Sequence, residues 1–168
     1  SGAGNLVYGN SAKLVYENTA SHNIGNEWNA STKEVDLNTP SDLVATGNLT
    51  VDKFKLTSGK LTLGTNNLTV GQIEGGSKTS FIITNGTGAL TVKNVAATAV
   101  TFPVGISAGS NSPARINNTN TNDFTVKVRA MTDIYGSNPS WSYSNVLNKA
   151  WDITPAGTGA NANITLFW

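Results

Sequence analysis

The single histidine and the scattered acids are the residues from which a catalytic site would have to be built. His22 is the only histidine and cysteine is absent, so a Ser-His-Asp arrangement would depend on His22, and a thiolate site is excluded. No Gly-x-Ser-x-Gly sequence is present. His22 lies between Ser21 and Asn23, which favour turns, and we interpret it as an ordinary loop residue. The sequence therefore predicts no nucleophilic catalysis.

Paired carboxylates are the other chemistry that the acids could perform. Glu34 and Asp36 are the closest approach to a pair, because residues two apart in a strand face the same side. We interpret them as surface charges rather than as the two acids of a glycosidase. A calcium ion on Asp36, Asp42 or Asp133 with loop carbonyls stays open as a minor alternative, although no EF-hand loop is present. We predict that the protein is not an enzyme and needs no metal and no cofactor.

Aromatic side chains gather in one polar stretch, 134–147, which is rich in Ser and Asn. Its members Tyr135, Trp141 and Tyr143 form the candidate ligand site, with a glycan as the expected ligand. Sugars are bound by aromatic faces together with amide and hydroxyl hydrogen bonds, and binding groups tend to lie on loops carried by a rigid scaffold. The alternative is that Trp141 and Tyr143 pack over the end of a sheet.

Composition excludes several classes of partner. The 11 Lys and Arg residues balance 10 Asp and Glu for a formal net charge of +1, and they form no basic stripe, so we do not expect nucleic acid as a partner. Charged residues make up 12% of the chain, and Asn, Thr, Ser and Gly take their place. No apolar run approaches the roughly 20 residues of a membrane span, so we expect no membrane insertion.

The element that must position any site is a repeat within residues 47–105. The tripeptide Leu-Thr-Val returns three times, at steps of 68 − 49 = 19 and 90 − 68 = 22 residues. Self-similarity at roughly 20 residues is typical of a solenoid, in which each coil buries its apolar face against the next. An antiparallel sandwich of hairpins is the alternative, because the Asn-Gly turn signal also suits a hairpin.

Each turn of the solenoid is expected to hold three short strands with Gly or Asn at the corners. Leu and Val of the tripeptide point inward and Thr points outward, so the threonines should form a ladder with a spacing of about 4.8 Å. The expected first strands begin at Leu49, Leu68 and Leu90, the second contain Phe54, Ile73 and Val95, and the third are Leu61–Leu63, Phe81–Ile83 and Val100–Phe102.

The chain divides into three predicted parts. Residues 1–34 should form two short strands, Leu6–Tyr8 and Leu14–Tyr16, which suit a hairpin, followed by a cap. Trp28 is interpreted as the side chain that covers the first coil, with an exposed aromatic on a binding face as the alternative. Residues 35–103 are the solenoid, which opens with irregular strands at 35–37 and 43–44.

Residues 104–168 carry longer alternating runs, at 124–130, 150–154 and 162–168. Such runs predict an antiparallel, β-sandwich-like part. The predicted fold class is therefore all-β: a short parallel β-solenoid with coils of about 19–22 residues, followed by this part. The chain ends inside an apolar strand at Trp168, and we expect it to be a fragment of a longer chain.

Several phrases resemble the secreted and surface-exposed repeat proteins of Bacteroidota that the type IX secretion system exports. Among them are Ile24–Trp28, Leu56–Gly64, Val100–Gly105 and Ala150–Thr154. In that family such stretches lie in the extracellular part of adhesin-like chains, ahead of a C-terminal sorting domain that the 168 residues do not contain. The resemblance implies a secreted, cell-surface location and supplies no catalytic residues.

These observations predict a non-enzymatic extracellular structural module of a cell-surface adhesin or fibre. Its expected partners are neighbouring modules of the same chain or identical subunits joined head to tail, because open strand edges can pair with another chain. The alternative is a carbohydrate-binding module of a larger secreted polysaccharide-degrading protein. A third option, binding to ice or to a mineral, rests on the threonine ladder alone.

Overall fold

The computed structural model of the chain describes residues 6–131 and 147–168, whose strands form three sheets. Sheet A has the order β1 (Lys13–Tyr16), β3 (Glu34–Asn38), β5 (Leu49–Ser58), β7 (Leu68–Gly75), β9 (Leu90–Val95), β14 (Asn122–Ala130) and β15 (Lys149–Pro155). Sheet B has the order β12 (Ser110–Asn111), β11 (Val104–Ser107), β8 (Phe81–Ile83), β6 (Lys60–Thr62), β4 (Leu43–Ala45) and β2 (His22–Ile24). Sheet C has the order β10 (Val100–Phe102), β13 (Ala114–Asn118) and β16 (Ala162–Leu166).

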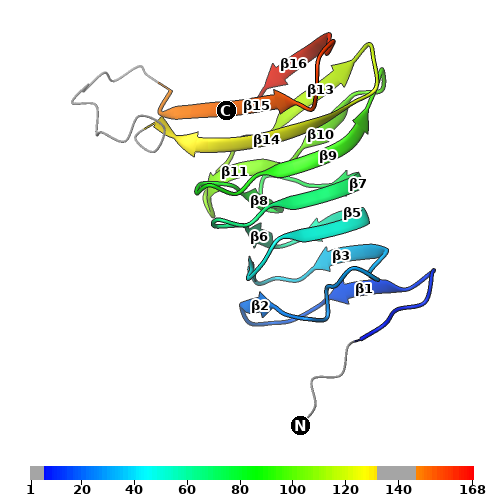
Figure 1. Ribbon diagram of the computed structural model, residues 1–168. Helices are drawn as coiled ribbons and strands as arrows, with labels where there is room; N and C mark the ends of the chain where they lie inside the picture. The colour runs from blue at the N-terminus through cyan, green and yellow to red at the C-terminus, as the bar shows by residue number, and fades with distance from the viewer. Residues whose placement is uncertain (1–5, 132–146) are drawn as a thin grey trace.

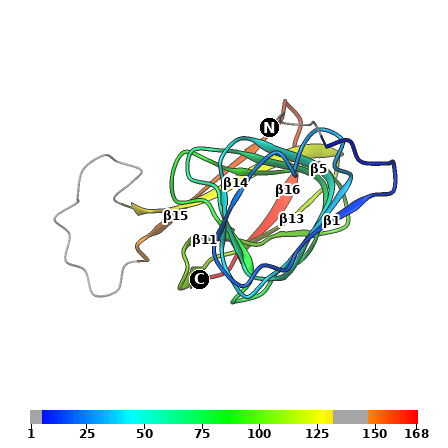
Figure 2. The ribbon, with the colours of Figure 1, turned by 90° about the horizontal axis from the view of Figure 1, so that it is seen from below.

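Sheets A and B are the two walls of a β-solenoid of about four turns, which confirms the predicted fold class. The strands of successive coils pair in parallel, from β1 to β9 in sheet A and from β2 to β11 in sheet B. The register places Leu68 between Leu49 and Leu90, so the three copies of the tripeptide stack as predicted. Figure 1 shows this stack from the side, and Figure 2 shows along its axis how the coils enclose the interior.

Each coil contains two strands where the sequence predicted three. The first and second expected strands are one continuous strand, as in β5, which runs from the tripeptide through Phe54. This strand bends because two outward residues, Asp52 and Lys53, separate the buried side chains of Val51 and Phe54. A straight strand would place only one outward residue between two inward ones. The expected corner between the first and second strands is thus replaced by a bend inside one strand.

The last of the expected third strands lies in a different sheet from the others. Val100–Phe102 is β10, which pairs antiparallel with β13 in sheet C, so its predicted place in the solenoid was wrong. β11 takes that place instead, with Val104 beside Ile82. Pro103 separates the two strands, and proline restricts the residue before it and donates no hydrogen bond of its own. The chain therefore leaves one sheet and enters the other at this residue.

The N-terminal strands also differ from the expected hairpin. Leu6–Tyr8 forms no strand, and β1 pairs in parallel with β3. β2 pairs in the same way with β4. The parallel stack consequently begins at Lys13, ahead of the predicted start at residue 35. Alternation could not distinguish these partners, because side chains alternate with a period of two in parallel and antiparallel strands alike.

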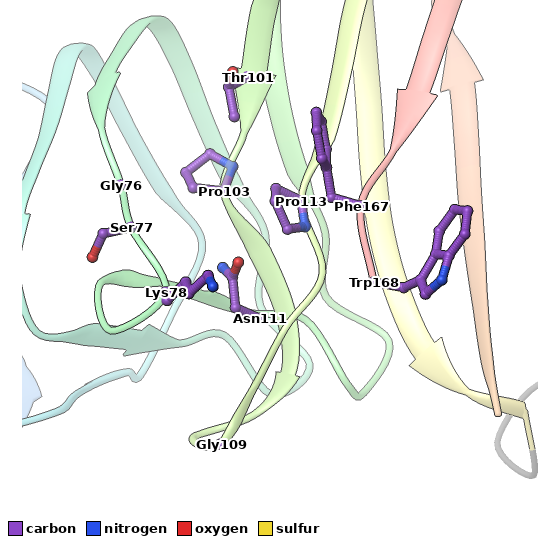
Figure 3. Close-up of a pocket in the computed structure, with 10 residues that line it drawn as sticks. All are labelled: Gly76, Ser77, Lys78, Thr101, Pro103, Gly109, Asn111, Pro113, Phe167 and Trp168. Atoms are coloured by element: carbon purple, nitrogen blue, oxygen red, sulfur yellow. The ribbon is translucent and has the colours of Figure 1, made fainter. Parts of the chain in front are cut away.

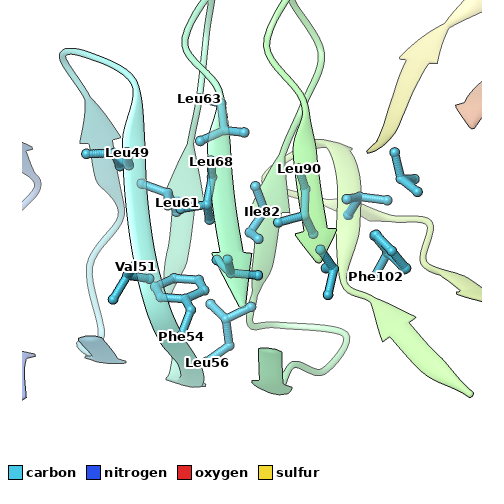
Figure 4. Packing of buried hydrophobic residues seen from close by; sticks show 14 of the residues in the cluster. Leu49, Val51, Phe54, Leu56, Leu61, Leu63, Leu68, Ile82, Leu90 and Phe102 are labelled. Carbon is cyan, nitrogen blue, oxygen red and sulfur yellow. The ribbon is translucent and has the colours of Figure 1, made fainter. Parts of the chain in front are cut away.

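The core is one cluster of buried apolar side chains that extends from Tyr16 to Val128. Inward residues of sheet A, such as Leu68 and Phe54, meet those of sheet B, such as Leu61 and Ile82, and each of these four is 0% exposed (Figure 4). Burying one side chain of this size contributes about 1.5–3 kcal/mol. A single coil has no second layer to bury these residues, so the coils depend on one another.

The antiparallel part both extends the solenoid and forms a sheet of its own: β14 and β15 belong to sheet A, whereas β13 and β16 belong to sheet C. β14 pairs antiparallel with β9, and β15 pairs antiparallel with β14, so sheet A is continuous across residue 104. Sheet C contributes Phe102, Ala114 and Ile116 to the same core. Because β14 runs opposite to both of its neighbours, β15 runs in the same direction as the solenoid strands.

Candidate functional site

The residues predicted to bind a glycan, Tyr135, Trp141 and Tyr143, lie outside the described residues, and so does the candidate calcium ligand Asp133. The part of the chain that the structure does describe offers three other surfaces with polar or aromatic groups. These are the outward face of sheet A, a cluster around His22 near the N-terminus, and a groove on sheet C.

A row of threonines crosses the outward face of sheet A. Thr50, Thr69 and Thr91 share one register, as the repeat predicted. β14 and β15 extend the row, with Thr125 beside Thr91 and Thr154 beside Thr125. The hydroxyls of Thr91 and Thr125 are hydrogen-bonded at 2.8 Å. Sequence analysis missed the last two threonines because they lie outside the repeat, although the alternation within 124–130 and 150–154 already placed them opposite the inward residues.

Beyond the bend of the same strands, opposite charges alternate from coil to coil. Asp36, Lys55 and Glu74 share one register, and Glu34 and Lys53 share another. The Lys53 Nζ lies 3.1 Å from the Glu74 Oε1. Exposed ion pairs contribute only about 0–1 kcal/mol each, but cross-strand pairs of opposite charge favour the register that brings them together. This face therefore reinforces the stacking of the coils.

Asp36 is enclosed by this network. Its carboxylate accepts hydrogen bonds from the Lys13 Nζ at 2.9 Å and the Thr57 hydroxyl at 2.7 Å, and the Lys55 Nζ lies 3.5 Å away. Burial alone would raise the pKa of Asp36, but these hydrogen bonds and the two lysine charges outweigh burial and lower the pKa below its ordinary value. Lys13 also contacts Glu34 at 3.4 Å, so the two acids of the suspected pair meet at a lysine.

Asp42, another candidate ligand for calcium, contacts a lysine: its Oδ1 lies 3.6 Å from the Lys60 Nζ. Within the described residues no three His, Asp or Glu side chains form a group that could hold a metal ion. Both oxygens of Asp36 have partners from lysine or threonine, so its role in this structure is to join neighbouring coils.

His22 lies in strand β2, not in a loop as predicted. Its Nε2 is 3.2 Å from the Glu27 Oε1, which also accepts hydrogen bonds from the Tyr16 hydroxyl at 3.1 Å and the Gly25 N–H at 2.9 Å. Burial, reinforced by the Glu27 charge, raises the pKa of Tyr16, so the phenol remains a hydrogen-bond donor. A carboxylate and a phenol surround the imidazole, and this arrangement ties β1, β2 and the segment after β2 together.

Trp28 lies above this cluster and is 6% exposed, so it is not an exposed aromatic on a binding face. Its ring centroid is 5.6 Å from that of Phe54 and 6.5 Å from that of Tyr16. Its indole N–H donates a hydrogen bond to the Thr50 carbonyl at 3.0 Å. Trp28 thus belongs to the buried core and packs over the first tripeptide of the repeat.

A groove of about 520 Å³ opens beside sheet C (Figure 3). Pro103, Pro113 and Phe167 line it. Pro113 lies between the buried residues Ser112 and Ala114, and Phe167 follows β16 and is 45% exposed. The Phe167 N–H donates to the Pro113 carbonyl at 3.0 Å, which holds the last strand at the groove. Trp168 lies at the rim and is 78% exposed.

The walls of the groove are two short connections between solenoid strands. One is the segment 76–78, which follows β7, and the other is the hairpin that contains Gly109 and Asn111. Gly76 has a φ of +90°, and a Cβ there would lie 2.7 Å from the Pro103 Cβ, so glycine is required for this wall to approach the floor. The floor and walls are remote in sequence, and no local motif could have predicted the groove.

Comparison with protein-family models, with curated proteins and with solved structures found no match. The function is therefore argued from the fold and from these surfaces. None of the helices within the described residues is long and apolar enough to cross a membrane.

Proposed function

We propose that this chain is a non-enzymatic structural module of an extracellular adhesin or fibre, in which it acts as a stiff spacer. The observation that carries the proposal is the in-register stack: one core and one set of ladders run through all the coils. Bending such a stack would separate core layers on one side, and each exposed CH₂ group would cost about 0.8 kcal/mol. The module is accordingly expected to keep a fixed length.

The proposed location is the cell surface, after secretion. It is supported by the resemblance of the sequence phrases to surface proteins of Bacteroidota and by a surface rich in hydroxyl and amide groups. Antibodies raised against the purified chain should label intact cells of the source organism. Labelling that appears only after the cells are permeabilised would contradict this part of the proposal.

Stiffness can be measured directly because the chain has no cysteine of its own. Spin labels on Ser11→Cys and Thr158→Cys would mark exposed positions near the first coil and in the connection between β15 and β16. Pulsed dipolar spectroscopy should give one narrow distance distribution. A shorter pair, Ser11→Cys with Lys93→Cys, is the control for the width that the label itself contributes. A long pair much broader than the short pair would contradict the spacer function.

Identical copies joined head to tail are the proposed partners. β1 and β15 are the edges of sheet A, and edge strands carry unpaired N–H and C=O groups that can pair with another chain. Head-to-tail contacts that do not close produce filaments. Electron micrographs of the concentrated chain should then show fibres. If the chain stays a strict monomer at high concentration, the proposed assembly is wrong. The spacer function would then be tested by the spin-label distances alone.

A further inference from the structure

The groove on sheet C combines an apolar floor with an excess of positive charge. Its floor contains Phe167, which is 45% exposed, together with Pro103 and Pro113 (Figure 3). Lys78 belongs to one wall, and none of the described residues that line the groove is acidic. An exposed aromatic ring surrounded by polar groups is more typical of a ligand site than of the solvent-exposed face of a sheet.

A second cation lies in the next outward row of sheet C. The register of this sheet places Arg115 between Thr101, which lines the groove, and Thr165. Most lysines of the chain are paired: Lys13, Lys33, Lys53, Lys55, Lys60 and Lys127 each contact an acid. Within the described residues, neither Lys78 nor Arg115 takes part in an ion pair. The charges beside the groove are therefore available to an anionic partner.

We propose that this groove binds a segment of an anionic polysaccharide whose sugars carry carboxylates. A pyranose ring has an apolar C–H face, which Phe167 would cover, and the negative face of an aromatic ring attracts such C–H groups. Lys78 and Arg115 would pair with the carboxylates. The hydroxyl of Thr101 and the amide of Asn111 are placed to bond sugar hydroxyls, since both residues line the groove.

Charge and shape distinguish this partner from two others. A neutral glycan would leave both cations without a partner, and an acidic peptide would not need an exposed aromatic ring beside a pair of proline rings. The floor of the groove adjoins the strands of sheet C, and its walls are the segment 76–78 and the hairpin that contains Gly109 and Asn111, so several parts of the fold set its shape before the ligand binds. This site is distinct from the predicted Tyr135, Trp141 and Tyr143, and the proposal does not depend on the stiffness of the module.

The test is affinity electrophoresis or calorimetry of the whole chain with polygalacturonate. The same polymer with its carboxylates methyl-esterified is the neutral control, and polyglutamate is the acidic-peptide control. Polygalacturonate should retard the chain in the gel or give a binding signal in the calorimeter. The other two polymers should bind at least about tenfold more weakly, a difference of about 1.4 kcal/mol. Absence of binding to polygalacturonate would overturn the proposal, as would equal binding to the esterified polymer.

Two variants locate the site. Lys78→Ala and Phe167→Ala should each weaken binding about three- to tenfold, since both side chains are exposed and neither belongs to the buried core cluster. Lys93→Ala is the matched control, because it removes an equal charge from an exposed position on sheet A. If Lys93→Ala weakens binding as much as Lys78→Ala, the attraction is unspecific and the proposed site is wrong. If polyglutamate binds as well as polygalacturonate and Phe167→Ala changes neither, the ligand is not a sugar.

Discussion

Glycines at the corners of the coils differ in what requires them. Gly75 has a φ of +77°, and a Cβ there would lie 2.2 Å from the carbonyl oxygen of Leu56 in the preceding coil. Gly64 also has a positive φ, +60°, but no atom lies within 4 Å of its would-be Cβ. Gly47 has neither constraint. The three positions thus separate the cost of the backbone conformation from the cost of close stacking.

Alanine at these positions should destabilise the chain in that order. Gly75→Ala combines a left-handed conformation with a backbone clash and should lower the free energy of unfolding by about 2–5 kcal/mol. Gly64→Ala should lower it by about 1–2 kcal/mol. Gly47→Ala should leave it unchanged or raise it by about 0.4–1 kcal/mol, because alanine restricts the unfolded chain. Urea unfolding of the three variants measures this, and equal losses at Gly75 and Gly64 would show that the coils tolerate a wider spacing.

Asp36 should make the stability of the chain depend on pH. Its pKa is lowered in the folded protein, so its contribution is present above the unfolded value of about 3.9 and is lost as the pH falls through the lower folded value. The difference in unfolding free energy between the wild type and Asp36→Asn should be largest near neutral pH and should shrink below about pH 4. Thermal unfolding from neutral to acidic pH measures it.

Asp52→Asn is the matched control for this titration, since the Asp52 carboxylate is 74% exposed and contacts only Lys33 at 3.3 Å among the ion pairs of the described residues. Its effect on stability should be small at every pH. A pH dependence as large for Asp52→Asn as for Asp36→Asn would mean that the general charge of the surface, and not the Asp36 network, governs acid stability.

At the scale of the elements, one buried threonine joins the solenoid to the antiparallel part. Thr84 follows β8 and is 0% exposed. Its hydroxyl accepts a hydrogen bond from the Val128 N–H at 2.8 Å and donates one to the Val128 carbonyl at 3.1 Å. The side chain therefore supplies to β14 the two bonds that a neighbouring strand would supply. Next to it, the Asn85 Oδ1 accepts a bond from the Ala130 N–H at 3.2 Å.

Thr84→Val should uncouple these elements, because it keeps the shape of the side chain but leaves the N–H and C=O of Val128 without partners. A buried unsatisfied group costs about 1–3 kcal/mol, so the loss should be about 2 kcal/mol or more. Thr84→Ser keeps the hydroxyl and should lose less. Thr62→Val, on the half-exposed outer side of β6, should change stability by no more than about 0.5 kcal/mol. Equal losses for the valine and serine variants would assign the effect to packing and not to the hydrogen bonds.

The elements also show what the sequence could predict. The Leu-Thr-Val period and the alternation of Leu and Val with Thr were enough for the parallel stack and its register, because only that register buries every Leu and Val. The break in alternation after Val51 did not predict that two expected strands would merge into β5. Such a break occurs both at a bend within a strand and at a corner between two strands. The choice between β10 and β11 for the last coil depended on pairing with β13, which is remote in sequence.

The candidate sites were also predictable from the sequence only in part. The threonine row was predicted where the repeat carries it, and it was missed at Thr125 and Thr154, where antiparallel strands carry it. The groove joins 76–78, 101–113 and 167–168, and no local pattern links these segments. Local sequence predicts what each strand buries, whereas a surface built from several strands depends on their order in space.

For the molecule as a whole, the stack has a tryptophan near each end. Trp28 covers the first coils, and Trp151 on β15 packs against the core and donates its indole N–H to the Ser112 carbonyl at 2.9 Å. β1 and β15 each pair with one neighbour, whereas β5 and β7 pair with two. In a stack whose units contact only their neighbours, the strands with a single partner open first.

Amide hydrogen exchange should therefore show protection that is lowest in β1, β2 and β15 and highest from β5 to β9. Trp28→Ala, a change that costs about 3–5 kcal/mol when the site is buried, should lower protection at the first coils and spare β9. Trp151→Ala should do the reverse, lowering protection in β14 and β15 and sparing β1 and β3. If either variant lowers the protection of all strands equally, the chain unfolds as one cooperative unit, and the coupling through the shared core and Thr84 is stronger than the coupling of each coil to its neighbour.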